Sequence, residues 1–210
     1  MKTLLTLCIC LSGFSSLTAQ NLPVFTAMAE EDANYFETID NLPGEVLPGC
    51  SWYCGGTVHA FDASSQLPDY RSISYGPSQA HDFDVSTAWV EGKEDYGIGE
   101  RLTYVFDMRD APEHELGITH LLIANGYKKN KALWEKNSRV KRLRVYINEK
   151  PHCDVELLDV FTFQRVRIGK LMLPQKDILN LSFEILEVYP GDEYKDTAIS
   201  ELLIDGVGVH

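Results

Sequence analysis

The stretch Arg142-Leu143-Arg144-Val145-Tyr146-Ile147 alternates apolar side chains with polar or aromatic ones at every second position. A period of two residues is typical of a β-strand that has one face buried and the other in water. The segment therefore predicts a strand with leucine, valine and isoleucine in the core and arginines on the outer face. It decides the fold class because similar stretches recur along the chain.

At least five further segments carry short apolar runs of strand length, and loops of Gly, Asp, Asn and Pro separate them. These predicted strands are 102–106, 118–124, 166–173 (with a phase slip near Gly169), 181–185 and 199–204. Several short strands with regular turn signals predict an all-β sandwich or barrel. No segment of about 12 or more residues with apolar side chains at helical spacing lies between these strands. This argues against a fold in which strands and helices alternate.

Charge is unevenly distributed over the 210 residues, which hold 19 Lys+Arg and 31 Asp+Glu for a net charge of -12. Residues 20–70 contain eight acids and neither Lys nor Arg. We therefore expect an acidic N-terminal extension or linker over 20–49, with a short helix around Ala27 to Phe36, followed by one domain over 50–210. An acidic protein is not expected to bind nucleic acid.

The first nineteen residues have the features of a signal peptide. Lys2 supplies the positive start, Leu4 to Phe14 form the apolar stretch, and a run of small residues ends at Ala19. This stretch is shorter than the roughly 20 residues that span a bilayer. We expect a protein secreted to the periplasm or the extracellular space, with no integral membrane segment after cleavage.

Removal of the signal peptide would leave three cysteines: Cys50, Cys54 and Cys153. In an oxidising compartment, Cys50 and Cys54 can close a small disulfide loop. The alternatives are two reduced thiols, or a bridge from Cys153 to one of them. A zinc site is not expected, because no nearby histidine completes a set of four ligands.

Two acids and a hydroxyl lie close together in Asp82-Phe83-Asp84-Val85-Ser86-Thr87-Ala88-Trp89. In a tight loop, Asp82, Asp84 and Thr87 can turn their oxygens inward, and an all-oxygen set suits calcium. The alternative is an Asx turn at the start of a strand. Glu201 stands among apolar residues of the last strand; such an acid is paired, metal-bound or on a solvent-facing edge.

A basic stretch runs from Tyr127 to Val145 and contains eight basic residues and one acid. Its aromatic residues Tyr127 and Trp134 could stack on sugar rings or on the bases of a single strand. The alternative is a solvated loop that enters a strand. Export further disfavours nucleic acid as the ligand.

Catalysis has little support in the sequence. The six histidines are scattered, and none of the motifs of serine hydrolases, zinc proteases, phosphate loops or dinucleotide sites is present. His81 beside Asp82 could form an acid–base pair of an unrecognised hydrolase, but we favour a structural role. We therefore predict that the protein is not an enzyme.

Several motifs together resemble discoidin-like domains, also called factor 5/8 type C or galactose-binding-like domains. The residues 82–89 with Ser200-Glu201 are similar to the calcium-bearing frame of these domains and of family 32 carbohydrate-binding modules. A closer resemblance is to the NADase-type glycan-binding domain of streptococcal NAD glycohydrolase toxins, which serves translocation. The matching pieces are 50–56, 87–92, 97–100, 125–127, 137–141 and 194–201.

The resemblance implies a jelly-roll β-sandwich that binds glycans through its loops and has no enzymatic activity of its own. In the toxins, NAD glycohydrolase activity belongs to a separate catalytic domain that follows this module. The resemblance of the module therefore implies no such activity here. The resemblance also implies a structural calcium ion. Its ligands would be Asp82, Thr87 and Glu201, with Asp84 a weaker candidate because Phe83 stands where glycine is usual.

The function predicted from the sequence is a secreted, non-catalytic, calcium-stabilised glycan-binding module. Its partners would be glycans or glycoconjugates; the alternative is a protein-interaction or adhesion module that uses the same loops on a protein partner. The candidate glycan-binding residues are Tyr127 and Trp134 for stacking, Asn137 and Arg139 for hydroxyl contacts, and Tyr96 as a weaker candidate.

Overall fold

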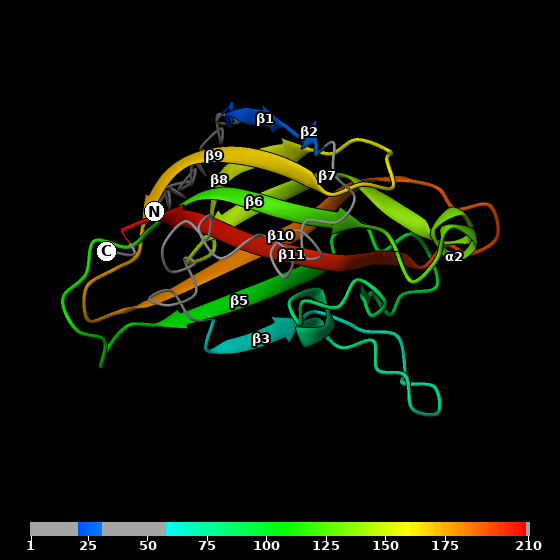
Figure 1. Cartoon of the computed structure of the whole chain (residues 1–210), viewed down its shortest axis with the longest axis horizontal. Coiled ribbons are helices and arrows are strands. Elements are labelled where there is room, and N and C mark those ends of the chain that lie inside the picture. Colours follow the sequence, from blue (N-terminus) through cyan, green and yellow to red (C-terminus); the bar gives the residue numbers. More distant parts are fainter. Residues whose placement is uncertain (1–20, 31–57, 209–210) are drawn as a thin grey trace, which may run out of the picture.

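The computed structural model describes residues 21–30 and 58–208, and Figure 1 shows how their strands are arranged. The N-terminal elements are the strands β1 (Val24–Thr26), β2 (Met28–Ala29) and β3 (Ala60–Ala63), the 3-10 helix η2 (Pro77–Ala80) and the strand β4 (Trp89–Val90). The long strands and the helix α2 follow: β5 (Arg101–Asp107), β6 (Gly117–Asn125), α2 (Lys131–Lys136), β7 (Ser138–Ile147), β8 (Lys150–Glu156), β9 (Gln164–Met172), β10 (Ile178–Tyr189) and β11 (Thr197–Val207).

All six strands predicted from the alternating pattern are present as β5, β6, β7, β9, β10 and β11. In β5, burial alternates strictly, and Leu102, Tyr104 and Phe106 are inaccessible to solvent. The predicted phase slip in β9 is also present. Gly169 has a φ of +83°, and the register between β6 and β9 shifts between Ile118 and His120.

The strands form one hydrogen-bonded network that folds over a common core. The strands run β2-β9-β6-β11-β7-β10-β5-β3, and β8 pairs with β7. Only two residue pairs, Thr197 with Ser138 and Ala198 with Arg139, join β11 to β7, so the network divides there into two layers. Side chains of β6, β9 and β11 share one apolar cluster with those of β5, β7, β8 and β10. The fold is therefore the predicted all-β sandwich.

The direction of the strands gathers four connections, including the two longest that the structure describes in full, at one end of the sandwich. We call this the helix end, because it carries α2 (Figure 1). Four connections meet there: residues 64–100, 126–137, 157–163 and 190–196. The connections 108–116, 148–149 and 173–177 lie at the opposite end. The residues that the sequence suggested for calcium or glycan binding all lie within the described part of the chain. They are at the helix end or on the strand ends next to it.

The segment expected to be a linker begins as part of the sheet. β1 runs parallel to β8, with Val24 opposite Asp154, and β2 pairs with β9. The expected helix from Ala27 is therefore wrong for Met28 and Ala29, which are strand. Backbone hydrogen bonds to neighbouring strands outweigh a weak helical pattern here. The rest of that expected helix lies outside the described residues.

β8 and α2 were not predicted, and each has a local reason. In β8, Asp154 occupies a buried position, so the apolar alternation is broken. Its carboxylate is held by Arg144 at 2.7 Å and Arg142 at 2.8 Å. The helix α2 has only six residues, and Asn130 caps it by accepting a hydrogen bond from the Leu133 amide at 2.9 Å.

Candidate functional site

The acidic loop between η2 and β4 is organised by its own side chains. The Asp84 amide donates to Asp82 Oδ1 at 3.0 Å, and the Ser86 amide donates to Asp84 Oδ1 at 2.8 Å. The Thr87 hydroxyl lies 2.8 Å from both Asp82 Oδ2 and the Asp84 carbonyl oxygen. These are the Asx turns that the sequence offered as the alternative. They also bring the oxygens of Asp82, Asp84 and Thr87 together.

Glu201 lies beneath this loop on β11 and is inaccessible to solvent. Both of its carboxylate oxygens are enclosed without a hydrogen-bond partner among the described residues. Burial, and then repulsion from the Asp82 carboxylate, raise the pKa of Glu201 to about 9. The sequence also allowed the alternative that Glu201 faces solvent on an edge strand. This alternative is wrong, because β11 lies between β6 and β7 in the sheet.

The loop therefore offers an oxygen-rich set above a buried acid that lacks hydrogen-bond partners. Within residues 21–30 and 58–208, no group of three or more His, Cys, Asp or Glu side chains is spaced to hold a metal ion. A cation would consequently need the Thr87 hydroxyl and backbone carbonyls beside Asp82 and Glu201. Such a mixed set of hard oxygens fits calcium and not zinc or copper.

Asp84 is the weaker candidate ligand for a structural reason. Hydrogen bonds from Ser86 hold its carboxylate and lower its pKa, so the side chain is already engaged. Phe83 before it adopts a φ of +63°, the left-handed region that favours glycine. The backbone thus keeps a glycine-like conformation despite the side chain, and Asp84 directs its carbonyl oxygen to Thr87.

His81 is buried and takes part in packing. Its Nδ1 lies 3.0 Å from the Leu202 carbonyl oxygen, and its ring packs edge-on against Tyr104 at 5.0 Å. Burial lowers its pKa, despite the hydrogen bond with Leu202. Asp82, in contrast, is exposed and bonds to Thr87 and Gln79. The geometry favours the structural role for His81.

The basic stretch forms a compact cluster around Trp134, which is only 6% exposed. The indole Nε1 donates to the Asn125 carbonyl at 2.9 Å. Arg139 Cζ lies 4.4 Å from the centroid of the Trp134 ring, and Lys131 Nζ lies 3.7 Å from it. A ring covered in this way cannot stack on a sugar unless its neighbours move. The predicted exposed platform is therefore not present in this conformation.

Three other predicted glycan contacts, Tyr127, Asn137 and Arg139, are buried to a similar extent. Asn137 Nδ2 donates to the Leu133 carbonyl at 2.9 Å. Arg139 pairs with Asp159 at 2.7 Å. These side chains are close to one another, but in this conformation they hold the loop together.

Gly126 allows this packing. Its φ is +85°, and a Cβ atom added there would lie 2.7 Å from Trp134 Cδ1 and from Arg139 Cγ. Only glycine fits such a close approach in the left-handed region.

Tyr96 stands apart from this cluster, beside β11. It is partly exposed, its carbonyl accepts from the Thr197 hydroxyl at 2.9 Å, and Lys195 Nζ is 6.0 Å from its ring. Phe161, in the loop between β8 and β9, was not singled out from the sequence. Its ring meets Trp134 edge-on at 5.7 Å, and only the fold brings it to the basic stretch.

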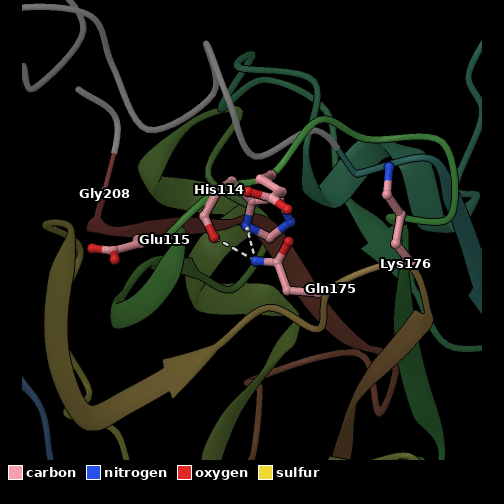
Figure 2. Close-up of a pocket in the computed structure, with 6 residues that line it drawn as sticks. His114, Glu115, Gln175, Lys176 and Gly208 are labelled. Atoms are coloured by element: carbon pink, nitrogen blue, oxygen red, sulfur yellow. Dashed lines mark hydrogen bonds between the residues drawn. The ribbon is translucent and has the colours of Figure 1, made fainter.

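A pocket lies at the end opposite the helix end (Figure 2). His114 Nδ1 is 3.3 Å from Gln175 Nε2, which also donates to the His114 carbonyl. Lys176 and Gly208 complete part of its wall. None of the residues predicted to bind calcium or glycan lines this pocket.

Cys153 is a free, buried thiol, and burial raises its pKa to about 12. The predicted partners of a disulfide, Cys50 and Cys54, and the predicted signal peptide lie outside the described residues. Among the described helices, none is long and apolar enough to cross a membrane.

The sandwich and its loops define a discoidin-like β-sandwich domain. Residues 52–205 match the NAD glycohydrolase translocation F5/8 type C domain, and the chain belongs to that family. Its members are translocation or binding domains and not catalytic ones. No curated protein sequence matches the chain.

Two solved structures are similar to the chain at low identity. A mycobacterial arabinofuranosyltransferase, AftD, is 18% identical with a TM-score of 0.47; the match covers 74% of this chain and 11% of AftD. The C-terminal domain of a chitobiase from Bacteroides fragilis is 14% identical with a TM-score of 0.41, and the match covers 73% of this chain and 97% of that domain. The chain thus spans only a small part of the length of AftD.

Proposed function

We propose that the protein is a secreted, non-catalytic module that binds glycans through the loops of the helix end and is stabilised there by calcium. Membership of the F5/8 type C family over residues 52–205 is the observation that carries the proposal. The gathering of four connections at one end, among them the two longest that the structure describes in full, supports a ligand-binding role for that end.

Calcium would be held by Asp82, Thr87 and Glu201, with the Asp84 carbonyl in support. The enclosed, unpartnered carboxylate of Glu201 supports this assignment, because an isolated buried carboxylate is costly and a cation would stabilise its charged form. The ion would fix the loop 81–87 against β11. It would then act on glycan binding only through the shape of the loops.

The glycan would meet the partly exposed aromatic residues of the helix end. Tyr96 is one such residue, and Phe161 is another. The buried residues Trp134, Asn137 and Arg139 would position the surface beneath the ligand. A substitution of Trp134 would therefore act on glycan binding through this surface.

A pull-down from cell-surface extracts distinguishes a glycan ligand from a protein partner. The protein is immobilised, and extracts are applied before and after enzymatic removal of glycans. We expect capture to be lost after deglycosylation. Retention of the same partners after complete deglycosylation would contradict the proposal and favour the adhesion module. The variant Tyr96→Ala, which removes a partly exposed ring, is expected to weaken capture. Met172→Ala removes an exposed apolar side chain at the opposite end of the sandwich and serves as its control.

A further inference from the structure

Phe161 lies close to two lysine side chains that come from the basic stretch. Lys128 Nζ is 5.1 Å from the centroid of the ring, and Lys131 Nζ is 5.2 Å from it. Phe161 is half-buried. Cations at this distance interact favourably with an aromatic ring. The arrangement combines two ammonium groups and one half-buried aromatic residue at the helix end.

The positive charge of this pair is poorly balanced. Asp159 accepts two hydrogen bonds from the guanidinium of Arg139, at 2.7 and 3.0 Å, and so neutralises it. Lys131 has only Glu135, at 3.8 Å, and both side chains are about half exposed. In the described part of the chain, Lys128 has no acid within ion-pair distance. Of the two ammonium groups, only that of Lys131 therefore has a counter-ion among the described residues, and this contact is long and exposed.

Lys128 makes contacts through both its backbone and its side chain. Its amide donates to Ser200 Oγ at 2.9 Å, and its ammonium lies 4.6 Å from the centroid of Phe163. The residue is 7% exposed, and burial lowers its pKa to about 8, so the side chain is still mostly charged at neutral pH. An unpaired charge in such surroundings is costly, and an anion supplied from outside would offset that cost.

The ammonium is also accessible. Among the described residues, the enclosed polar atoms without a partner belong to other side chains, and Lys128 Nζ is not one of them. It therefore retains some contact with solvent. Lys131 Nζ lies at a similar distance from the Phe161 ring, so an anion beside that ring would be near both ammonium groups.

We propose that Lys128 and Lys131, whose ammonium groups both lie beside Phe161, bind the carboxylate or sulfate group of an acidic glycan. This inference rests on the proposed glycan-binding function and adds the charge of the ligand. The flanking acids Glu135 and Asp159 limit the positive surface to a short anionic group. A nucleic acid would need a longer row of phosphate contacts.

Isothermal titration calorimetry at physiological salt tests the proposal with three probes of equal length. They are an oligogalacturonate, which carries carboxylates; a chondroitin sulfate oligosaccharide, which adds sulfate; and a neutral oligogalactoside. We expect at least one acidic probe to bind about tenfold more tightly than the neutral one, because each ion pair at a partly buried site adds a charge-assisted interaction. The two acidic probes distinguish carboxylate from sulfate.

Two variants test the residues. Lys128→Met and Lys131→Met are each expected to reduce the affinity for the acidic probe about tenfold and to leave that for the neutral probe unchanged. Lys170→Met, an exposed lysine toward the far end of β9, is the matched control. Lys131 is exposed, so its variant keeps the test decisive if Lys128→Met were to disturb the fold.

The outcomes separate this inference from the function on which it rests. Equal affinity for acidic and neutral probes, or unchanged affinity in both lysine variants, would overturn the anion site while glycan binding stands. Binding of a single-stranded oligonucleotide as tight as that of the acidic probes would also overturn it. Failure of every oligosaccharide in the calorimeter and on a broad glycan array would remove the proposed function itself.

Discussion

Lys128 and Glu201 are both buried at the helix end, and each lacks an oppositely charged partner among the described residues. Burial lowers the pKa of the lysine to about 8 and raises that of the acid to about 9. Each therefore reduces the stability of the ligand-free protein at neutral pH. Groups of this kind are often retained where an external ion completes the site.

The burial of Lys128 should make the free energy of unfolding depend on pH. Its pKa is about 8 in the folded protein and 10.5 in an exposed lysine. Between these values the unfolded chain binds the proton and the folded one does not, so folding stability rises with pH in this window. At pH 7 the buried charge costs up to about 3 kcal/mol.

Urea unfolding of the wild type and of Lys128→Met should therefore differ most at pH 7, with the variant more stable. The difference should shrink as the pH rises from about 8 to 10.5. A constant difference across this range would contradict the assignment.

Calcium should raise the thermal stability through Glu201. At a concentration about one hundred times the Kd, a ligand that binds only the folded state adds about 2.7 kcal/mol. We expect differential scanning fluorimetry to show a Tm several degrees higher in excess calcium than in EDTA. Glu201→Gln should abolish this shift, whereas Glu113→Gln at the opposite end should keep it. An equal Tm in calcium and EDTA for the wild type would refute the metal assignment.

Trp134 should behave as a residue of the core. Trp134→Phe keeps an aromatic ring but loses the hydrogen bond to the Asn125 carbonyl and leaves a small cavity. We expect a loss of about 2 kcal/mol in the free energy of unfolding, measured in urea. A loss of glycan affinity with unchanged stability would instead identify Trp134 as a direct ligand contact.

At the scale of elements, β1 and β2 join the sandwich through its neighbouring strands. The Asp154 amide donates to the Pro23 carbonyl, the Ala27 amide to the Glu156 carbonyl, and the Glu30 amide to the Phe163 carbonyl, each at 2.8 to 2.9 Å. Ala27 is also part of the core. Residues 23–30 thus close the open edges of β8 and β9.

A chain that starts at residue 31 should consequently be less stable than one that starts at residue 21. Loss of these three backbone hydrogen bonds corresponds to about 3 kcal/mol, measured by urea unfolding of the two chains. Equal stability would show that these residues contribute nothing to the fold.

The sequence predicts those elements whose pattern is local. β5 and β10 were predictable because apolar side chains alternate with polar ones along each of them. β8 was not, because Asp154 is buried only when Arg142 and Arg144 of β7 lie beside it. A pairing of this kind depends on the register of two strands, which the composition of either one does not reveal.

The same reasoning applies to the candidate site. The grouping of Asp82 with Thr87 follows from their spacing, and Glu201 was noticeable as an acid in an apolar strand. The burial of Trp134 was not predictable, because Phe161 and Arg139, which cover it, come from a distant loop and from β7. Aromatic residues in a basic stretch look alike in the sequence whether they are exposed or buried.

At the scale of the whole molecule, the two ends of the sandwich differ in chemistry. The helix end carries the acidic loop over Glu201 and, beside it, the two lysines around Phe161. The net charge of -12 therefore conceals a local basic cluster. The family assignment and this arrangement lead to the central claim, that the helix end binds glycans.

A glycan array probed with the labelled protein tests this claim most directly. The account predicts saturable binding to a restricted set of glycans, lost when unlabelled protein competes. It also predicts that the bound set is enriched in acidic sugars and that Lys131→Met weakens this enrichment. Absence of saturable binding to any glycan by the correctly folded protein would contradict the account.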